Sequence, residues 1–100
     1  MLKSFLISIL QKLFPPPHLL MNRIVDVLRV FGELGTLEIN DAVSTIFGKK
    51  PGLGNIYVAL HHLERAGIVR SQWNVRDGVR RKYYCLAEIA PWELVKLDQN

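Results

Sequence analysis

The fold of this chain is decided by residues 52–86, which read GLGNIYVALHHLERAGIVRSQWNVRDGVRRKYYCL. Apolar side chains recur there at the spacing of one helical face, which predicts a helix over 55–66 that ends at Gly67. Two strands are expected over 68–75 and 80–86, because the Asp77-Gly78 pair between them tolerates the positive φ angles of a tight hairpin turn. The predicted buried stripe of the helix consists of Ile56, Ala59, Leu60 and Leu63.

Upstream of this stretch, the pattern predicts a helix over 18–32 and a short extended segment over 36–39. Asn40 is the expected N-cap of a further helix that ends near Phe47, and the glycines and proline of 49–54 indicate a turn. Two helices around a turn, followed by a basic hairpin, form the plan of a winged helix-turn-helix. The expected fold class is therefore mainly α with a small β-hairpin, built as a domain over 18–86.

The ends of the chain carry two further predicted elements. Residues 1–14 read as an extra amphipathic N-terminal helix, stopped by the three prolines at 15–17, and fall short of the roughly 20 residues that a spanning helix needs. We expect this helix to pack on another copy of the chain as a dimerisation element, and the alternative is that it packs on its own domain. Residues 87–100 are expected to form a short, partly helical segment. The apolar stripe of the first helix consists of Leu2, Phe5, Leu6, Ile9, Leu10, Leu13 and Phe14.

Charge is concentrated in one part of the chain. The net charge is +4, but residues 49–82 hold eight basic and two acidic side chains, a local excess of +6. Such a field attracts polyanions, nucleic acid first and an anionic membrane second. Cys85 is the only cysteine, so an internal disulfide is excluded, which agrees with a reducing compartment. A cytoplasmic location is expected.

Double-stranded DNA is the expected partner, and it would meet two surfaces of a winged helix. The helix over 55–66 would enter the major groove and show side chains to base edges, while the hairpin over 76–82 would neutralise backbone phosphates. Tyr57, Trp73 and Tyr84 have a second interpretation, since aromatic side chains are more often core residues than ligand contacts. The predicted DNA contacts are Lys49, Lys50, Asn55, Tyr57, Val58, His61, His62, Arg65, Arg76, Arg80, Arg81 and Lys82.

The same stretch resembles the PadR-like family of transcriptional regulators, over about a third of the chain. The resemblance rests on GNIYVALHHLERAGIV, on the Trp-bearing RSQW and on RRKYYCL, whose basic tip and tyrosine pair are its most distinctive part. Gly35–Ile39 and Ala87 depart from the family pattern. The resemblance implies a repressor-like, sequence-specific DNA-binding regulator that acts as a homodimer. The matching positions are Gly54, Tyr57, Leu60, Leu63, Gly67, Val69, Trp73, Arg80, Arg81, Tyr83, Tyr84 and Leu86.

Other functions are weighed against this one. A winged-helix module that binds an acidic protein partner stays open, as does a peripheral membrane protein anchored by residues 1–14. An enzyme is not expected, because the chain has neither a nucleophile elbow nor a phosphate-binding loop. No metal or cofactor is expected, since the adjacent His61 and His62 point about 100° apart on a helix. The sequence does not indicate whether a small-molecule effector exists.

Overall fold

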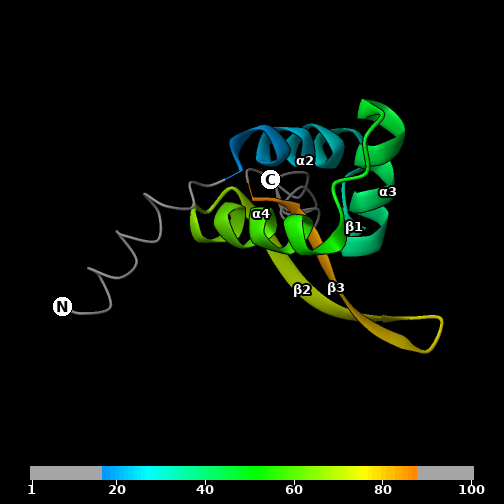
Figure 1. The fold of residues 1–100 in the computed structure, drawn as a ribbon. Helices are drawn as coiled ribbons and strands as arrows, with labels where there is room; N and C mark the ends of the chain where they lie inside the picture. Colours follow the sequence, from blue (N-terminus) through cyan, green and yellow to red (C-terminus); the bar gives the residue numbers. More distant parts are fainter. Residues whose placement is uncertain (1–16, 88–100) are drawn as a thin grey trace.

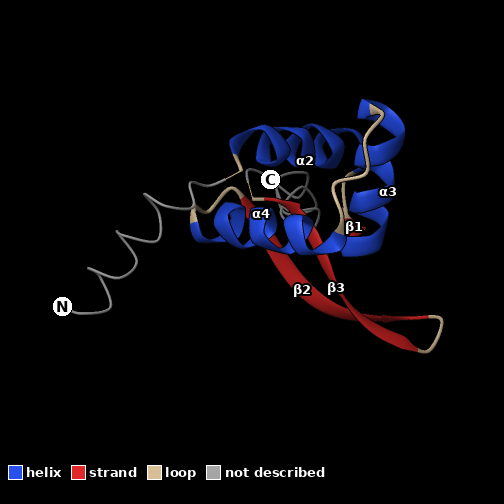
Figure 2. Ribbon diagram, in the orientation of Figure 1, coloured by secondary structure: helices blue, strands red, loops and turns tan. Residues whose placement is uncertain are grey.

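Three helices and a three-stranded sheet make up the computed structural model, which describes residues 17–87 (Figure 1). The chain runs through α2 (His18–Phe31), β1 (Leu34–Gly35), α3 (Thr36–Phe47) and α4 (Leu53–Arg65), and ends in β2 (Val69–Arg76) and β3 (Val79–Leu86). The sheet is antiparallel with strand order β1-β3-β2. Figure 2 shows the helices gathered on one side, with the β2–β3 hairpin extending away from them as a wing. This arrangement confirms the predicted winged helix.

The core lies where the three helices meet the base of the hairpin. Each helix contributes residues at the spacing of a single face, so the apolar side is buried and the polar side meets water. Val69 and Tyr84 close the core from the sheet side. The buried helical residues are Ile24, Val27 and Leu28 of α2, Ile39 and Val43 of α3, and Ile56, Ala59, Leu60 and Leu63 of α4.

The start of α3 corrects one prediction. Residues 36–39 are helical rather than extended, and the short strand lies two residues earlier, at Leu34–Gly35. The helix begins after an extended Gly35, whose N–H donates to the carboxylate of Glu38 at 3.1 Å. This is the half of a capping box in which the side chain three residues into the helix accepts from the N–H of the N-cap residue. Asn40 is therefore no N-cap; it lies inside α3 and is 3% exposed.

The hairpin turn forms as predicted. Asp77 and Gly78 have φ angles of 53° and 76°, the paired positive values of a type I′ turn, and Arg76 pairs with Val79 on either side. The register places Gln72 opposite Tyr83 and Trp73 opposite Lys82. Since side chains alternate along a strand, the hairpin has two distinct faces. The helices α2 and α4 are likewise confirmed within two residues of their predicted bounds.

The predicted helix over 1–14 and nearly all of the partly helical segment predicted over 87–100 lie outside the described residues. Among the helices that the structure describes, none combines the length and the hydropathy needed to span a bilayer.

Candidate nucleic-acid interface

Helix α4 presents a continuous outer stripe opposite its buried face. Ile56, Leu60 and Leu63 are almost completely buried, which fixes the rotation of the helix about its own axis. Tyr57, Val58, His61 and Arg65 are exposed as a result, at the three- and four-residue spacing of neighbours on one helical face. His62 is half-buried beside this stripe. The structure thus gathers four of the predicted DNA contacts along one side of a well-anchored helix.

Glu64 connects α4 to the base of the hairpin. Its two carboxylate oxygens each lie 2.9 Å from the hydroxyl of Ser71 on β2, and one of them lies 3.9 Å from the Nζ of Lys82 on β3. Ser71 and Lys82 belong to the same face of the hairpin, because Ser71 pairs with Tyr84 and Trp73 pairs with Lys82. These contacts identify the α4-facing side of the hairpin.

The α4-facing side of the hairpin carries cations next to exposed aromatic rings. The guanidinium of Arg80 lies 5.0 Å from the ring centroid of Trp73, a cation–π distance. Trp73 is 59% exposed and Tyr57 is 55% exposed, so neither is the core residue that the second interpretation of the sequence favoured. Tyr84 does belong to the core, where burial and then the nearby charge of Glu64 raise the pKa of its phenol above the ordinary 10.0.

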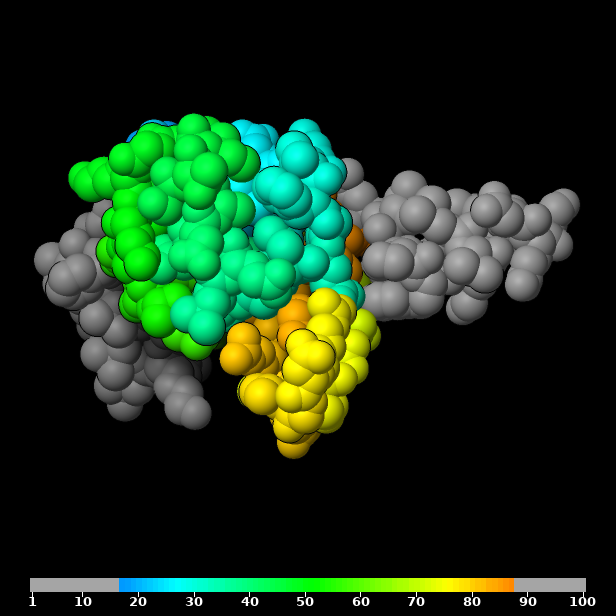
Figure 3. Space-filling view, turned by 90° about the vertical axis from the view of Figure 1, so that its right-hand side faces the viewer, coloured from blue at the N-terminus to red at the C-terminus, as the bar shows by residue number. Residues whose placement is uncertain are grey.

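A groove of about 500 Å³ separates α4 and the start of α3 from the hairpin. Tyr57 borders it on the helical side, while Trp73 and the run Arg80–Lys82 border it on the hairpin side. In Figure 3 the hairpin extends from the helical body as a separate projection. The groove, which we call the α4–wing groove, is therefore lined by aromatic rings and positive charge.

Arg76 does not join this groove. It lies on the opposite side of the hairpin, where its guanidinium forms an ion pair with Glu33 and lies 3.8 Å from the ring centroid of Tyr83. Arg81 also alternates away from Arg80 and Lys82 along β3, although it still borders the groove. The four cations predicted as one wing surface are thus divided between two faces.

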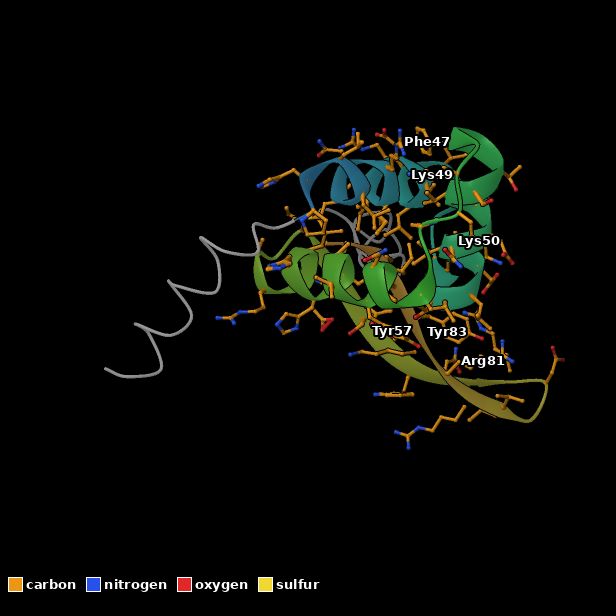
Figure 4. All side chains as sticks on the ribbon, in the orientation of Figure 1. Phe47, Lys49, Lys50, Tyr57, Arg81 and Tyr83 are labelled. Atoms are coloured by element: carbon orange, nitrogen blue, oxygen red, sulfur yellow. The ribbon has the colours of Figure 1, made fainter. Side chains whose placement is uncertain are left out.

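Lys49, Lys50 and Asn55 lie elsewhere. Figure 4 shows Lys49 and Lys50 along the loop between α3 and α4, whereas Tyr57 and Arg81 lie on the side of α4 toward the hairpin. The three residues border a second hollow together with Arg23 of α2. The Asn55 amide donates to the backbone oxygen of Pro51 at 2.6 Å, so this side chain already holds the start of α4.

Sequence reasoning missed two acidic residues that organise the interface, Glu33 and Glu64. The Glu64 contact with Ser71 spans seven residues and could have been anticipated from a helix that leads directly into a strand. The Glu33 contact with Arg76 spans 43 residues and has no local signal. Within residues 17–87, no group of three or more His, Cys, Asp or Glu side chains is placed to hold a metal ion.

The family model described as the transcriptional regulator PadR-like family matches residues 24–89. No curated protein matches the chain.

Several solved structures are similar in fold. Stf76 from the Sulfolobus islandicus plasmid-virus pSSVx has a TM-score of 0.60 and 22% identity, over 79% of this chain and 92% of that chain. A PadR family transcriptional regulator from Eggerthella lenta DSM 2243 has a TM-score of 0.58 and 16% identity, over 98% and 77%. Pex from Synechococcus sp. (strain PCC 7942) has a TM-score of 0.58 and 24% identity, over 95% and 91%. At these identities the likeness shows a shared winged-helix fold.

Proposed function

Because this chain belongs to the PadR-like family of transcriptional regulators, we propose that it binds double-stranded DNA in a sequence-specific manner. Helix α4 enters the major groove, and the hairpin lies along the adjacent backbone. The observation that carries this proposal is the α4–wing groove. It brings Tyr57 of the exposed α4 stripe and the cations Arg80 and Lys82 to one concave surface. A neighbouring hollow is bordered by Tyr57, His61 and Arg65 of the same stripe and again by Lys82.

Helix α4 and the hairpin are proposed to do different work. Arg65 and His61 on the outer stripe of α4 contact base edges, where a good bidentate arginine–guanine pair gives roughly 1–3 kcal/mol of discrimination. Arg80 and Lys82 contact phosphates, which position the protein without reading sequence. Trp73 holds the guanidinium of Arg80 in place through its ring. Affinity then comes mainly from the wing and specificity mainly from the helix.

We further propose that the protein acts as a homodimer assembled through residues 1–14. A helix of 13 residues is about 20 Å long and reads only a few base pairs, too few for useful specificity in a genome. A two-fold dimer overcomes this by placing two recognition helices about 34 Å apart on one face of the duplex. Burial of each large apolar side chain of the 1–14 stripe is worth roughly 1.5–3 kcal/mol.

DNA recognition is tested by selecting bound duplexes from a random pool and then titrating the selected site by fluorescence anisotropy. A consensus should emerge, and Arg65→Ala should relax it while affinity for random DNA stays nearly unchanged. Selection without any consensus, at an affinity no greater than that for random DNA, would contradict sequence-specific binding. Retention of an acidic protein in place of DNA would favour the protein-interaction alternative.

Assembly is tested separately by light scattering on the full chain and on a chain that starts at residue 15. The full chain should be a dimer, and the shortened chain should be a monomer or lose solubility. A full-length monomer, or a shortened chain that stays a well-behaved dimer, would remove residues 1–14 from the interface.

A further inference from the structure

Glu33 occupies the turn between α2 and β1 and reaches across to the hairpin. Its side chain is only 19% exposed, and its carboxylate accepts hydrogen bonds from two residues of β2. The Nε2 of Gln72 donates to one oxygen at 3.4 Å, and an Nη of Arg76 donates to the other. A carboxylate of the helical body therefore holds two side chains of the wing.

The guanidinium of Arg76 has a second partner, the ring of Tyr83. The 3.8 Å separation from the ring centroid is well within cation–π range, and Tyr83 is itself buried. Tyr83 pairs with Gly35 of β1, and a Cβ on Gly35 would lie 3.5 Å from the tyrosine ring. The guanidinium of Arg76, whose side chain is 45% exposed, thus lies between a carboxylate of the helical body and a ring at the base of the hairpin.

The position of Arg76 along the hairpin gives this contact its importance. Strand β1 pairs with β3 at Tyr83 and Tyr84, near the base. Arg76 instead pairs with Val79, at the last ladder position before the turn. Tyr83 lies four positions along β3 from Val79, which is about 13 Å along a strand. The long arginine side chain therefore connects the outer part of the hairpin back to the body.

We infer that Glu33, Gln72, Arg76 and Tyr83 form a wing brace, which sets the angle of the hairpin so that its opposite, α4-facing side meets the DNA backbone. Arg76 is then a positioning residue and not a phosphate contact, and an acidic side chain, Glu33, is needed for full DNA affinity. This role rests on the proposed function, whereas the brace itself is a property of the free protein.

The wing brace predicts a change in DNA affinity that is opposite to the change expected from simple electrostatics. Removal of a negative charge from a DNA-binding protein normally strengthens binding, because less charge repels the phosphates. Loss of Glu33 should instead weaken binding, because the hairpin loses its angle. Asp26, an exposed acid on α2, provides a matched control in which one acidic side chain is likewise replaced by alanine.

The test measures binding of the full chain to its selected duplex by fluorescence anisotropy at several salt concentrations. Glu33→Ala and Arg76→Ala should each weaken binding about two- to fivefold, the range of a partly exposed ion pair. Asp26→Ala should leave binding unchanged or slightly tighter. Because the two brace residues act together, the double variant should cost about as much as either single variant.

The salt dependence separates positioning from phosphate contact. Arg76→Ala should leave the slope of log K against log salt unchanged, whereas loss of a phosphate contact would flatten it by about 0.9. Tighter binding by Glu33→Ala, or a flatter slope for Arg76→Ala, would overturn the positioning role.

Amide hydrogen exchange without DNA tests the brace independently of the function. Glu33→Ala and Arg76→Ala should speed exchange over residues 73–81, while Asp26→Ala should not. Unchanged protection in both brace variants would refute the brace. Faster exchange in a protein that binds no DNA would support the brace and refute the proposed function, so the two failures are distinguishable.

Discussion

Glu64 lies on α4, the proposed recognition helix, next to Arg65, and its negative charge should oppose the proposed DNA binding in two ways. It should repel phosphates directly, and its Oε2 lies 3.9 Å from the Nζ of Lys82, a proposed phosphate contact. We expect Glu64→Gln to tighten binding. The new amide keeps an oxygen that can accept from the Ser71 hydroxyl, now 2.9 Å from the carboxylate, so the helix–hairpin junction should survive the change.

The expected gain in DNA affinity of Glu64→Gln has two contributions, which differ in their dependence on salt. The first contribution is the direct repulsion between the Glu64 carboxylate and a DNA phosphate. Two unit charges about 8 Å apart in water interact by about 0.5 kcal/mol, which corresponds to roughly a twofold change in affinity. A released Lys82 adds up to one phosphate contact, which steepens the log K against log salt slope by up to about 0.9. Over a fourfold rise in salt, that difference in slope reduces the part of the variant's affinity gain that comes from the Lys82 contact by about 3.5-fold.

The assay is an anisotropy titration of wild-type and Glu64→Gln proteins at about 50, 100 and 200 mM salt. The advantage of the variant should be largest at low salt and should shrink as salt rises. Lys82→Gln in the Glu64→Gln background is the control and should remove the salt-dependent part of the gain. Weaker binding by Glu64→Gln, or a gain independent of salt, would refute the pairing of Glu64 with Lys82 as the cause.

Three further predictions concern stability. Leu60→Ala, in the buried face of α4, should lower the free energy of unfolding by roughly 2–5 kcal/mol in urea denaturation, and a loss below about 1 kcal/mol would contradict its place in the core. Gly78→Ala should cost about 1 kcal/mol or more by the same measurement, because φ is 76° there, and an unchanged midpoint would argue against the type I′ turn. The raised pKa of Tyr84 makes the folded state favour the neutral phenol, so stability present below pH 10.0 should be lost as pH rises through the folded pKa. Tyr84→Phe should flatten that alkaline decline, and parallel pH curves for the two proteins would contradict the shift.

Periodicity and turn chemistry predicted most of the fold. The helices α2 and α4 follow from apolar spacing, and the hairpin follows from Asp77-Gly78, because these signals act over a few residues. The predicted start of α3 was wrong because Asn is a preferred N-cap residue, so the sequence favours Asn40 as the N-cap. The actual start uses backbone geometry at Gly35 and the side chain of Glu38, a pair without a strong signature.

The candidate site was predicted less completely than the fold. The exposed stripe of α4 could be derived because the buried stripe fixes it. Strand alternation already separates Arg76 from Arg80 and Lys82, but it does not reveal that Glu33, 43 residues away, is its partner. Trp73 alternates with polar residues in a way that suits either a core or an exposed face, and only the position of α4 decides between them.

The central place of β3 in the sheet has a consequence for the order in which the domain folds. The β2–β3 hairpin closes a turn of two residues, whereas pairing of Leu34 with Tyr84 closes a loop that contains all of α3, α4 and β2. Closure entropy grows with loop length, and non-local contacts form slowly. The hairpin should therefore form early and β1 should dock last, so that the helix-turn-helix unit is enclosed only in the final step. Substitutions in β1 should accordingly speed unfolding more than they slow folding.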